Sequence, residues 1–285
     1  MLPTFIIGLR EGLEASLIVG IVAAFLVAER RRDALAWMAA GVAAAVALCF
    51  GVAVALQLLS RDLPERAQEI LEAAIALVAV LAVTWMILWM RGHARTLKRT
   101  LEEGVRGALA AGSVRALVAM AFLAVLREGF ETSVFLLALF QHAESPAGAR
   151  FGATLGIALA VAIGYGIYRG GVRIDLARFF RVTGIVLVFV AAGLCAAAVH
   201  SAHEAGLVSI LQSRAIDLSW LIRPGTPLAA LITGILGLQP EPTGAETLAY
   251  LLYLVPMLAF VLWPGRQPAA PPTPRPVEMG ANSTS

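Results

Sequence analysis

The chain has 285 residues, of which 59% are hydrophobic and only 14% charged, and its formal net charge is +3. Soluble domains carry about 25% charged residues and about 45–50% apolar ones, so this composition excludes an ordinary soluble domain and favours a bundle of membrane helices. The excess positive charge is better explained by basic loops beside a membrane than by an acidic partner. Nucleic-acid binding is not expected.

Seven apolar runs are long enough to cross a bilayer, which takes about 20 helical residues. The predicted spans lie near residues 5–28, 35–59, 69–90, 116–140, 151–168, 180–204 and 246–263. We expect the first to be a retained helix rather than a signal peptide, because no basic region precedes it and charged residues interrupt it. The fold class is therefore an all-α membrane protein with seven transmembrane helices.

Lysine and arginine are distributed unevenly between alternate connections. Fifteen lie in the segments 29–34, 91–115 and 169–181 and in the tail. Only five lie in the alternate segments 60–68, 141–150 and 205–245. Cytoplasmic loops are the basic ones. We therefore predict that the N-terminus lies outside and the C-terminus in the cytoplasm, with residues 1–263 forming one transmembrane domain in the lipid bilayer. The tail 264–285 lacks apolar periodicity and is expected to be disordered.

A twelve-residue segment occurs twice in the chain. Residues 5–16 read FIIGLREGLEAS and residues 122–133 read FLAVLREGFETS, with seven identities at a constant offset of 117. The copies lie in the first and fourth spans, so their helices run in opposite directions through the bilayer. This predicts a 3+3 inverted repeat, about 1–90 against 116–204, with 246–263 as an extra helix. In transporters built this way, the substrate site lies near the midplane between the repeats.

Each copy places one arginine and two glutamates on one face of a helix, because positions i, i+1 and i+4 fall within about 100° of one another. The six residues are Arg10, Glu11, Glu14, Arg127, Glu128 and Glu131. A charge at the centre of a membrane helix costs at least about 2.5–3.5 kcal/mol, so these groups must face each other or water. They are either ion pairs that lock two helices together or part of a binding site.

The charge balance of the six residues favours a cation site. Four carboxylates against two guanidiniums leave net negative charge, which suits a hard cation with oxygen ligands. The arginines are expected to reduce repulsion between the carboxylates or to hold them through i,i+4 pairing. Gly12 and Gly129, next to the glutamates, are expected to let a neighbouring helix approach closely.

The two motifs, Arg10 to Glu14 and Arg127 to Glu131, resemble the paired REGxE motifs of the high-affinity iron permease family, which has yeast and bacterial members. The resemblance covers about residues 1–263. It implies a permease of the bacterial inner membrane that imports iron, expected as Fe³⁺, with Glu11, Glu14, Glu128 and Glu131 as iron ligands. It also implies a periplasmic iron-binding or iron-oxidising partner. Iron is then the transported substrate, and no permanent cofactor is expected.

Two weaker clusters lie at the outer ends of spans. Glu72 lies one turn beyond Glu69 at the start of the third span, and His200, His203 and Glu204 share one face at the end of the sixth. Both could be entry ligands for iron, although polar helix ends at an interface explain them as well. Trp85 and Trp89, near the end of the third span, are interpreted as interfacial anchors.

Two other functions compete with iron import. Carboxylate oxygens also suit Mn²⁺, so ligand type alone does not separate an iron permease from one for another divalent cation. An intramembrane enzyme using glutamates as acid and base is a third class. An enzyme needs an asymmetric site, whereas a duplicated and inverted site favours passage of an ion. We therefore predict a permease rather than an enzyme.

Overall fold

The computed structural model describes residues 1–28, 30–61, 63–93, 114–143, 145–169, 175–209 and 232–263, with seven single positions between 211 and 226. These residues form seven α-helices and one π-helical turn, with no β-strand among them. The helices are α1 (Leu2–Ala28), α2 (Asp33–Arg61), α3 (Glu65–His93), α5 (Val114–Gln141), α6 (Pro146–Tyr168), α7 (Leu176–Glu204) and α9 (Gly244–Leu262); the turn is η1 (Ile232–Leu236). The all-α fold with seven long helices agrees with the prediction, although only six of the seven predicted transmembrane helices are long and apolar enough to qualify as membrane spans.

Six of the helices are long and apolar enough to cross a membrane, so the chain is a multi-pass membrane protein. The remaining helix, α5, has 28 residues but carries Arg127, Glu128 and Glu131 in its middle. Its charged centre sets it apart from the other six.

Several helices begin earlier than their apolar runs. Helix α6 starts at Pro146, where the Ser145 side chain accepts a hydrogen bond from the backbone N of Gly148. Helix α7 starts at Leu176, where the Asp175 carboxylate accepts one from the backbone N of Arg178 at 3.0 Å. Capping side chains satisfy free N–H groups in the first turn of a helix. These first turns are therefore helical although their residues are too polar to belong to an apolar run. The predicted disordered tail and most of the 91–115 connection lie outside the described residues.

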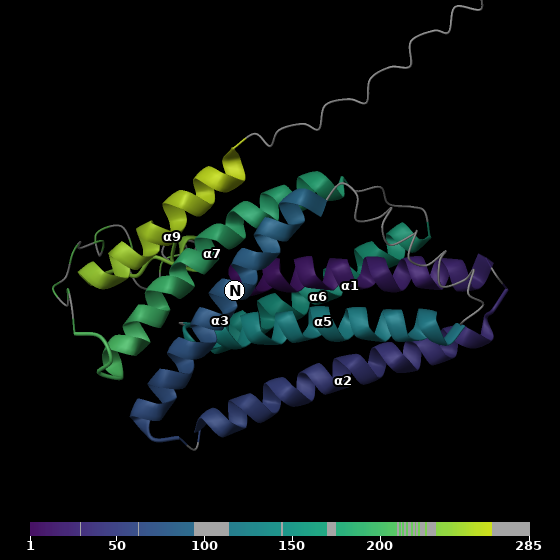
Figure 1. The fold of residues 1–285 in the computed structure, drawn as a ribbon, viewed down its shortest axis with the longest axis horizontal. Helices are drawn as coiled ribbons and strands as arrows, with labels where there is room; N and C mark the ends of the chain where they lie inside the picture. Colours follow the sequence, from purple (N-terminus) through teal and green to yellow (C-terminus); the bar gives the residue numbers. More distant parts are fainter. Residues whose placement is uncertain are drawn as a thin grey trace, which may run out of the picture.

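The helices pack in pairs, of which α1 with α6 and α2 with α5 run parallel and α3 with α7 runs antiparallel. Helix α1 lies along α6, α2 along α5, and α3 along α7, while α1 also contacts α5 and α9 packs on α7. In Figure 1, the axes of α1, α5 and α2 lie side by side in roughly the same orientation, and α3 and α7 cross them on one side. The largest apolar core joins α3 and α7 to α1, α6 and the C-terminal part of α5. The two motif-bearing helices therefore lie side by side inside the bundle.

Glycines set the closest helix contacts. A Cβ at Gly12 would lie 2.8 Å from the Cβ of Ala160 on α6, and one at Gly129 would lie 2.8 Å from the Sγ of Cys49 on α2. Real Cβ atoms essentially never come this close, so a side chain at either position would force the neighbouring helix or side chain to shift. The expectation that Gly12 and Gly129 admit a neighbouring helix is confirmed, and small residues at such contacts are typical of membrane bundles.

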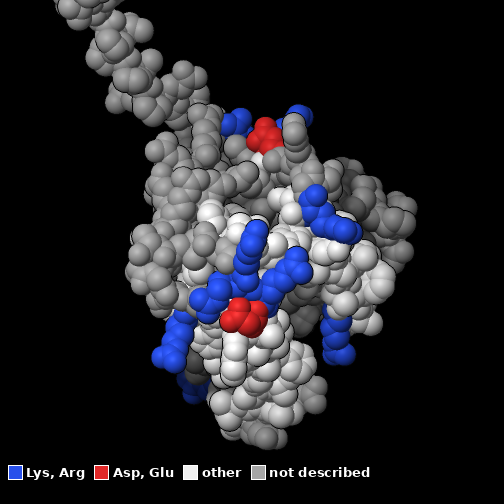
Figure 2. Space-filling view, turned by 90° about the vertical axis from the view of Figure 1, so that its right-hand side faces the viewer, with Lys and Arg blue, Asp and Glu red and all other residues white. Residues whose placement is uncertain are grey.

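Basic side chains gather at one end of the molecule, where α1 ends and α2 and α5 begin. Figure 2 looks onto this end and shows several Lys and Arg side chains grouped on it. The described arginines at the ends of helices on this side are all exposed: Arg30, Arg31, Arg32, Arg115, Arg169, Arg178 and Arg181. We call this end the basic end and the other the acidic end, because the acidic end carries Glu69 and Glu204.

Candidate metal site

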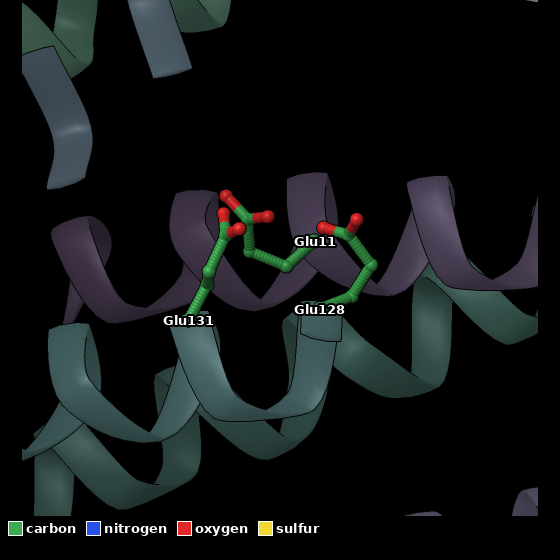
Figure 3. Close-up of side chains that lie close together, drawn as sticks. All are labelled: Glu11, Glu128 and Glu131. Atoms are coloured by element: carbon green, nitrogen blue, oxygen red, sulfur yellow. The ribbon is translucent and has the colours of Figure 1, made fainter. Parts of the chain in front are cut away.

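Three glutamates from α1 and α5 converge in the middle of the bundle. Glu11, Glu128 and Glu131 each offer a carboxylate oxygen, and these oxygens lie within 4.8 Å of one another. Glu11 and Glu128 are buried and Glu131 is half-buried. Figure 3 shows Glu128 and Glu131 rising from adjacent turns of α5 toward Glu11 on α1. We call these three residues the carboxylate triad.

The carboxylates of the triad are poorly satisfied by the protein. Within the described part of the chain, neither oxygen of Glu11 nor Oε2 of Glu128 has a hydrogen-bond partner, and all three atoms are buried. A buried polar group without a partner is costly, and a buried charge is more so. Two unit charges 4.8 Å apart repel by about 3 kcal/mol at an effective dielectric constant of 20. A bound cation would offset both costs.

The fourth motif glutamate lies outside the triad. The Nε of Arg10 lies 3.4 Å from Oε1 of Glu14, an i,i+4 pair within α1. Both side chains are buried, and Nε and Nη1 of Arg10 have no hydrogen-bond partner among the described residues. The sequence predicted four glutamates in one cage, and the structure brings three of them together.

The second arginine binds the triad directly. The Nε of Arg127 donates a hydrogen bond to Oε1 of Glu131 at 2.9 Å and lies 3.8 Å from Oε1 of Glu128. Its side chain is 55% exposed, whereas the Arg10 side chain is 1% exposed. The two motif copies share their sequence but differ in environment, so one side of the site is closed and the other is open.

An aromatic ring covers each motif arginine. The Arg10 guanidinium carbon lies 5.7 Å from the centre of the Phe180 ring, and that of Arg127 lies 5.8 Å from the centre of the Trp89 ring. Phe180 is on α7 and Trp89 is on α3. Such distances are within the range of cation–π attraction. The sequence assigned Trp89 to an interfacial anchor and gave Phe180 no role, since nothing in the linear pattern links them to the motifs.

The predicted entry ligands lie at the acidic end but only partly together. The Nδ1 of His200 lies 2.9 Å from Oε1 of Glu246 on α9, and its Nε2 lies 3.4 Å from Oε1 of Glu204. Both ring nitrogens of His200 are thereby engaged. Among the described residues, no ion pair or side-chain hydrogen bond joins the half-buried His203 to this group, and Glu72 accepts a hydrogen bond from Gln68 at 3.1 Å.

Two acidic residues that the sequence analysis did not assign to this group lie beside His200 and Glu204. Glu69 interacts electrostatically with Glu204, and Glu246 is 3% exposed and also closes a capping box with Thr243. Glu246 lies 46 residues beyond His200, so only the packing of α9 on α7 brings them together. The capping-box spacing of Thr243 and Glu246 was the one signal in the sequence for an ordered acid there.

Comparisons with known proteins place this arrangement in a family. The family model described as "Iron permease FTR1 family" matches residues 1–265. The protein named "Ferrous iron permease EfeU" from Escherichia coli O6:H1 is 42% identical over 267 residues, covering 93% of this chain and 96% of the relative. The protein of the same name from Yersinia pestis is 40% identical over 274 residues, covering 94% and 96%. No solved structure matches the chain.

Proposed function

Since the chain belongs to the iron permease FTR1 family, we propose that it imports iron across the bacterial inner membrane through the carboxylate triad. The observation that carries the proposal is the convergence of Glu11, Glu128 and Glu131 from two helices within 4.8 Å. Carboxylates so close together and so buried need a positive charge, and only part of it comes from Arg127. A metal ion bound by oxygens supplies the rest.

The ion in the site is proposed to be Fe³⁺. All three ligands are carboxylate oxygens, which are hard donors, and the family is one of iron permeases. Fe²⁺ is the second candidate, because the names of the relatives from Escherichia coli and Yersinia pestis describe ferrous iron permeases. Mn²⁺ remains the alternative outside iron, since oxygen ligands suit it equally.

The helix contacts support the inverted repeat that we propose for the transport pathway. If α1, α2 and α3 exchange with α5, α6 and α7, the observed pair α1–α6 becomes α5–α2, while α3–α7 and α1–α5 become themselves. The contacts therefore keep their pattern under the exchange. Rocking of one repeat against the other would open the triad first to one side of the membrane and then to the other.

The basic end is proposed to face the cytoplasm and the acidic end the periplasm. Exposed arginines at the basic end follow the bias expected of cytoplasmic loops. The acidic end, with Glu69, Glu204 and Glu246 around His200, would then attract a cation arriving from outside. We propose that a periplasmic iron-binding or iron-oxidising protein delivers iron there, and His203 and Glu72 remain candidate entry ligands.

Uptake of radioactive iron tests the proposal. Cells without other iron importers would express the chain with its periplasmic partners, as wild type or as Glu131→Gln at equal abundance in the membrane. Glu65→Gln, at the exposed start of α3, is the matched control because it removes the same charge far from the triad. We expect uptake by the wild type and the control and its loss in Glu131→Gln.

The ion is identified in the same cells. A ferrous chelator added without any reductant removes Fe²⁺ and leaves Fe³⁺, so uptake that persists in its presence requires Fe³⁺, and uptake that stops requires Fe²⁺. Excess Mn²⁺ should not compete. Equal uptake by the wild type and Glu131→Gln would rule out the triad as the path, and competition by Mn²⁺ would favour the alternative substrate.

A further inference from the structure

The two aromatic rings over the motif arginines form a matched pair. Phe180 lies four residues after the start of α7, and Trp89 lies four residues before the end of α3. Helices α3 and α7 are antiparallel neighbours, because Glu69 near the start of α3 interacts with Glu204 at the end of α7. Both rings therefore lie toward the basic end of the bundle, on the two helices that cross the motif helices in Figure 1.

Each ring–arginine contact joins the two halves of the chain. Phe180, from the second half, covers Arg10 on α1, and Trp89, from the first half, covers Arg127 on α5. The arginines in turn hold Glu14 and Glu131. A movement of one half against the other must therefore change both contacts.

The neighbouring aromatic residue on α3 shows that this placement is not a general property of the helix. Trp85, one turn earlier, is 69% exposed and points away from the core. Trp89 instead is partly buried against the main core, and Phe180 is buried within it. Both rings thus contact the motif arginines from α3 and α7, on the side of the basic end.

We propose that Phe180 and Trp89 are positioning residues that close the carboxylate triad from the basic end. They hold Arg10 and Arg127 by cation–π contact, and both contacts must be released before an ion leaves toward that end. The inference rests on the proposed function for its direction, since the basic end is the cytoplasmic exit only in that scheme. The contact of Trp89 is the weaker of the two, because Arg127 remains half exposed beneath it.

Chemical modification of the native carboxylates tests the closure without measuring transport. A permanently charged, membrane-impermeant carbodiimide with an added amine would be applied to inside-out vesicles, and modified peptides quantified by mass spectrometry. Modification of Glu128 is normalised to that of Asp33, which is exposed at the basic end. The variants are Trp89→Leu, Phe180→Leu and the double variant. Trp85→Leu is the matched control, and Trp89→Phe keeps a ring in place.

We expect the normalised modification of Glu128 to rise by at least roughly tenfold in the double variant, because both cation–π contacts are lost. Trp85→Leu and Trp89→Phe should match the wild type. Protection of Glu128 by added Fe³⁺ in each variant checks that the site is folded. An unchanged double variant, or an equal rise in Trp85→Leu, would overturn the inference.

The two proposals fail separately. If wild-type cells take up no iron while the modification pattern is as expected, the closure stands and the proposed function falls. If iron uptake is normal while Glu128 modification is the same in all variants, the function stands and the closure by Phe180 and Trp89 falls.

Discussion

Within the first motif copy, two glutamates one helical turn apart have different surroundings. Glu11 has two buried oxygens without hydrogen-bond partners and lies in the triad, whereas the buried Oε1 of Glu14, which also lacks a hydrogen-bond partner, lies 3.4 Å from Nε of Arg10. The difference arises because α1 presents Glu11 to α5, while Glu14 and Arg10 are enclosed together and Arg10 reaches α7 through Phe180. A ligand and a charge partner therefore alternate along one helical face.

This difference predicts unequal effects on iron binding. Glu11→Gln removes a charged ligand of the triad and should lower the affinity of the purified protein for iron by at least roughly tenfold, since hydrogen bonds and contacts with charged groups contribute about 1.5–3 kcal/mol. Glu14→Gln should leave the affinity within roughly threefold of wild type. It should instead lower the free energy of unfolding by about 3–5 kcal/mol, because Arg10 is left as a buried charge without its partner.

Equilibrium binding of radioactive iron in detergent and a denaturant titration provide the two measurements. Equal losses of affinity in Glu11→Gln and Glu14→Gln would mean that all four glutamates bind the ion together, as the sequence suggested. That result would contradict the triad.

At the scale of elements, the contact of α1 with α6 depends on the absence of side chains. A Cβ at Gly156 would lie 2.8 Å from the backbone N of Leu9, and backbone does not yield as a flexible side chain does. The contact fixes the height of the motif on α1 relative to the second repeat. Close packing of this kind, rather than a hydrophobic driving force, is what holds helices together in a lipid bilayer.

Gly156→Ala should therefore destabilise the protein by about 1–3 kcal/mol, the usual cost of overpacking. Gly51→Ala is the matched control, because a Cβ at Gly51 on α2 meets nothing within 4 Å. That control should be neutral or stabilising by up to about 1 kcal/mol, since alanine is the better helix former. Unfolding titrations in detergent that give Gly156→Ala and Gly51→Ala the same stability would refute the close contact.

Helix α9 is held to α7 by a buried charge. Glu246 binds His200 and caps its own helix through Thr243, so Glu246→Ala should cost about 1–3 kcal/mol from the lost cap and hydrogen bond. The Glu204 side chain, the other partner of His200, is 52% exposed, so Glu204→Ala should cost at most about 1 kcal/mol. Comparison of the two variants by thermal unfolding checks this order; a larger loss in Glu204→Ala would reverse it.

At the scale of the whole molecule, the uneven distribution of arginine predicts one orientation in the membrane. Leu207→Cys, exposed just after α7 at the acidic end, should react with an impermeant maleimide in intact spheroplasts. Arg31→Cys, at the basic end, should react only after the membrane is opened, because basic connections stay in the cytoplasm. Cys49 and Cys195 would be replaced by alanine. Labelling of Arg31→Cys in intact spheroplasts would reverse the proposed direction of import.

Much of the fold and the kind of site could be predicted without the structure. Runs of about 20 apolar residues specify membrane helices directly, since the bilayer requires every backbone group to bond within its own helix. The helical period likewise fixes that Arg10, Glu11 and Glu14 share a face. The helix starts at Pro146 and Leu176 were missed because caps, rather than hydropathy, determine them.

The sequence by itself determined the helices, the duplicated motif and the family, because these depend on local periodicity and on residue identity. The tertiary structure alone decided which carboxylates meet. Glu11, Glu128 and Glu131 converge, Glu14 turns to Arg10, and Phe180 and Trp89 cover the two arginines. The physical reason is that these contacts join residues far apart in the chain. They follow from how glycine contacts let the helices approach and cross, which no local pattern encodes.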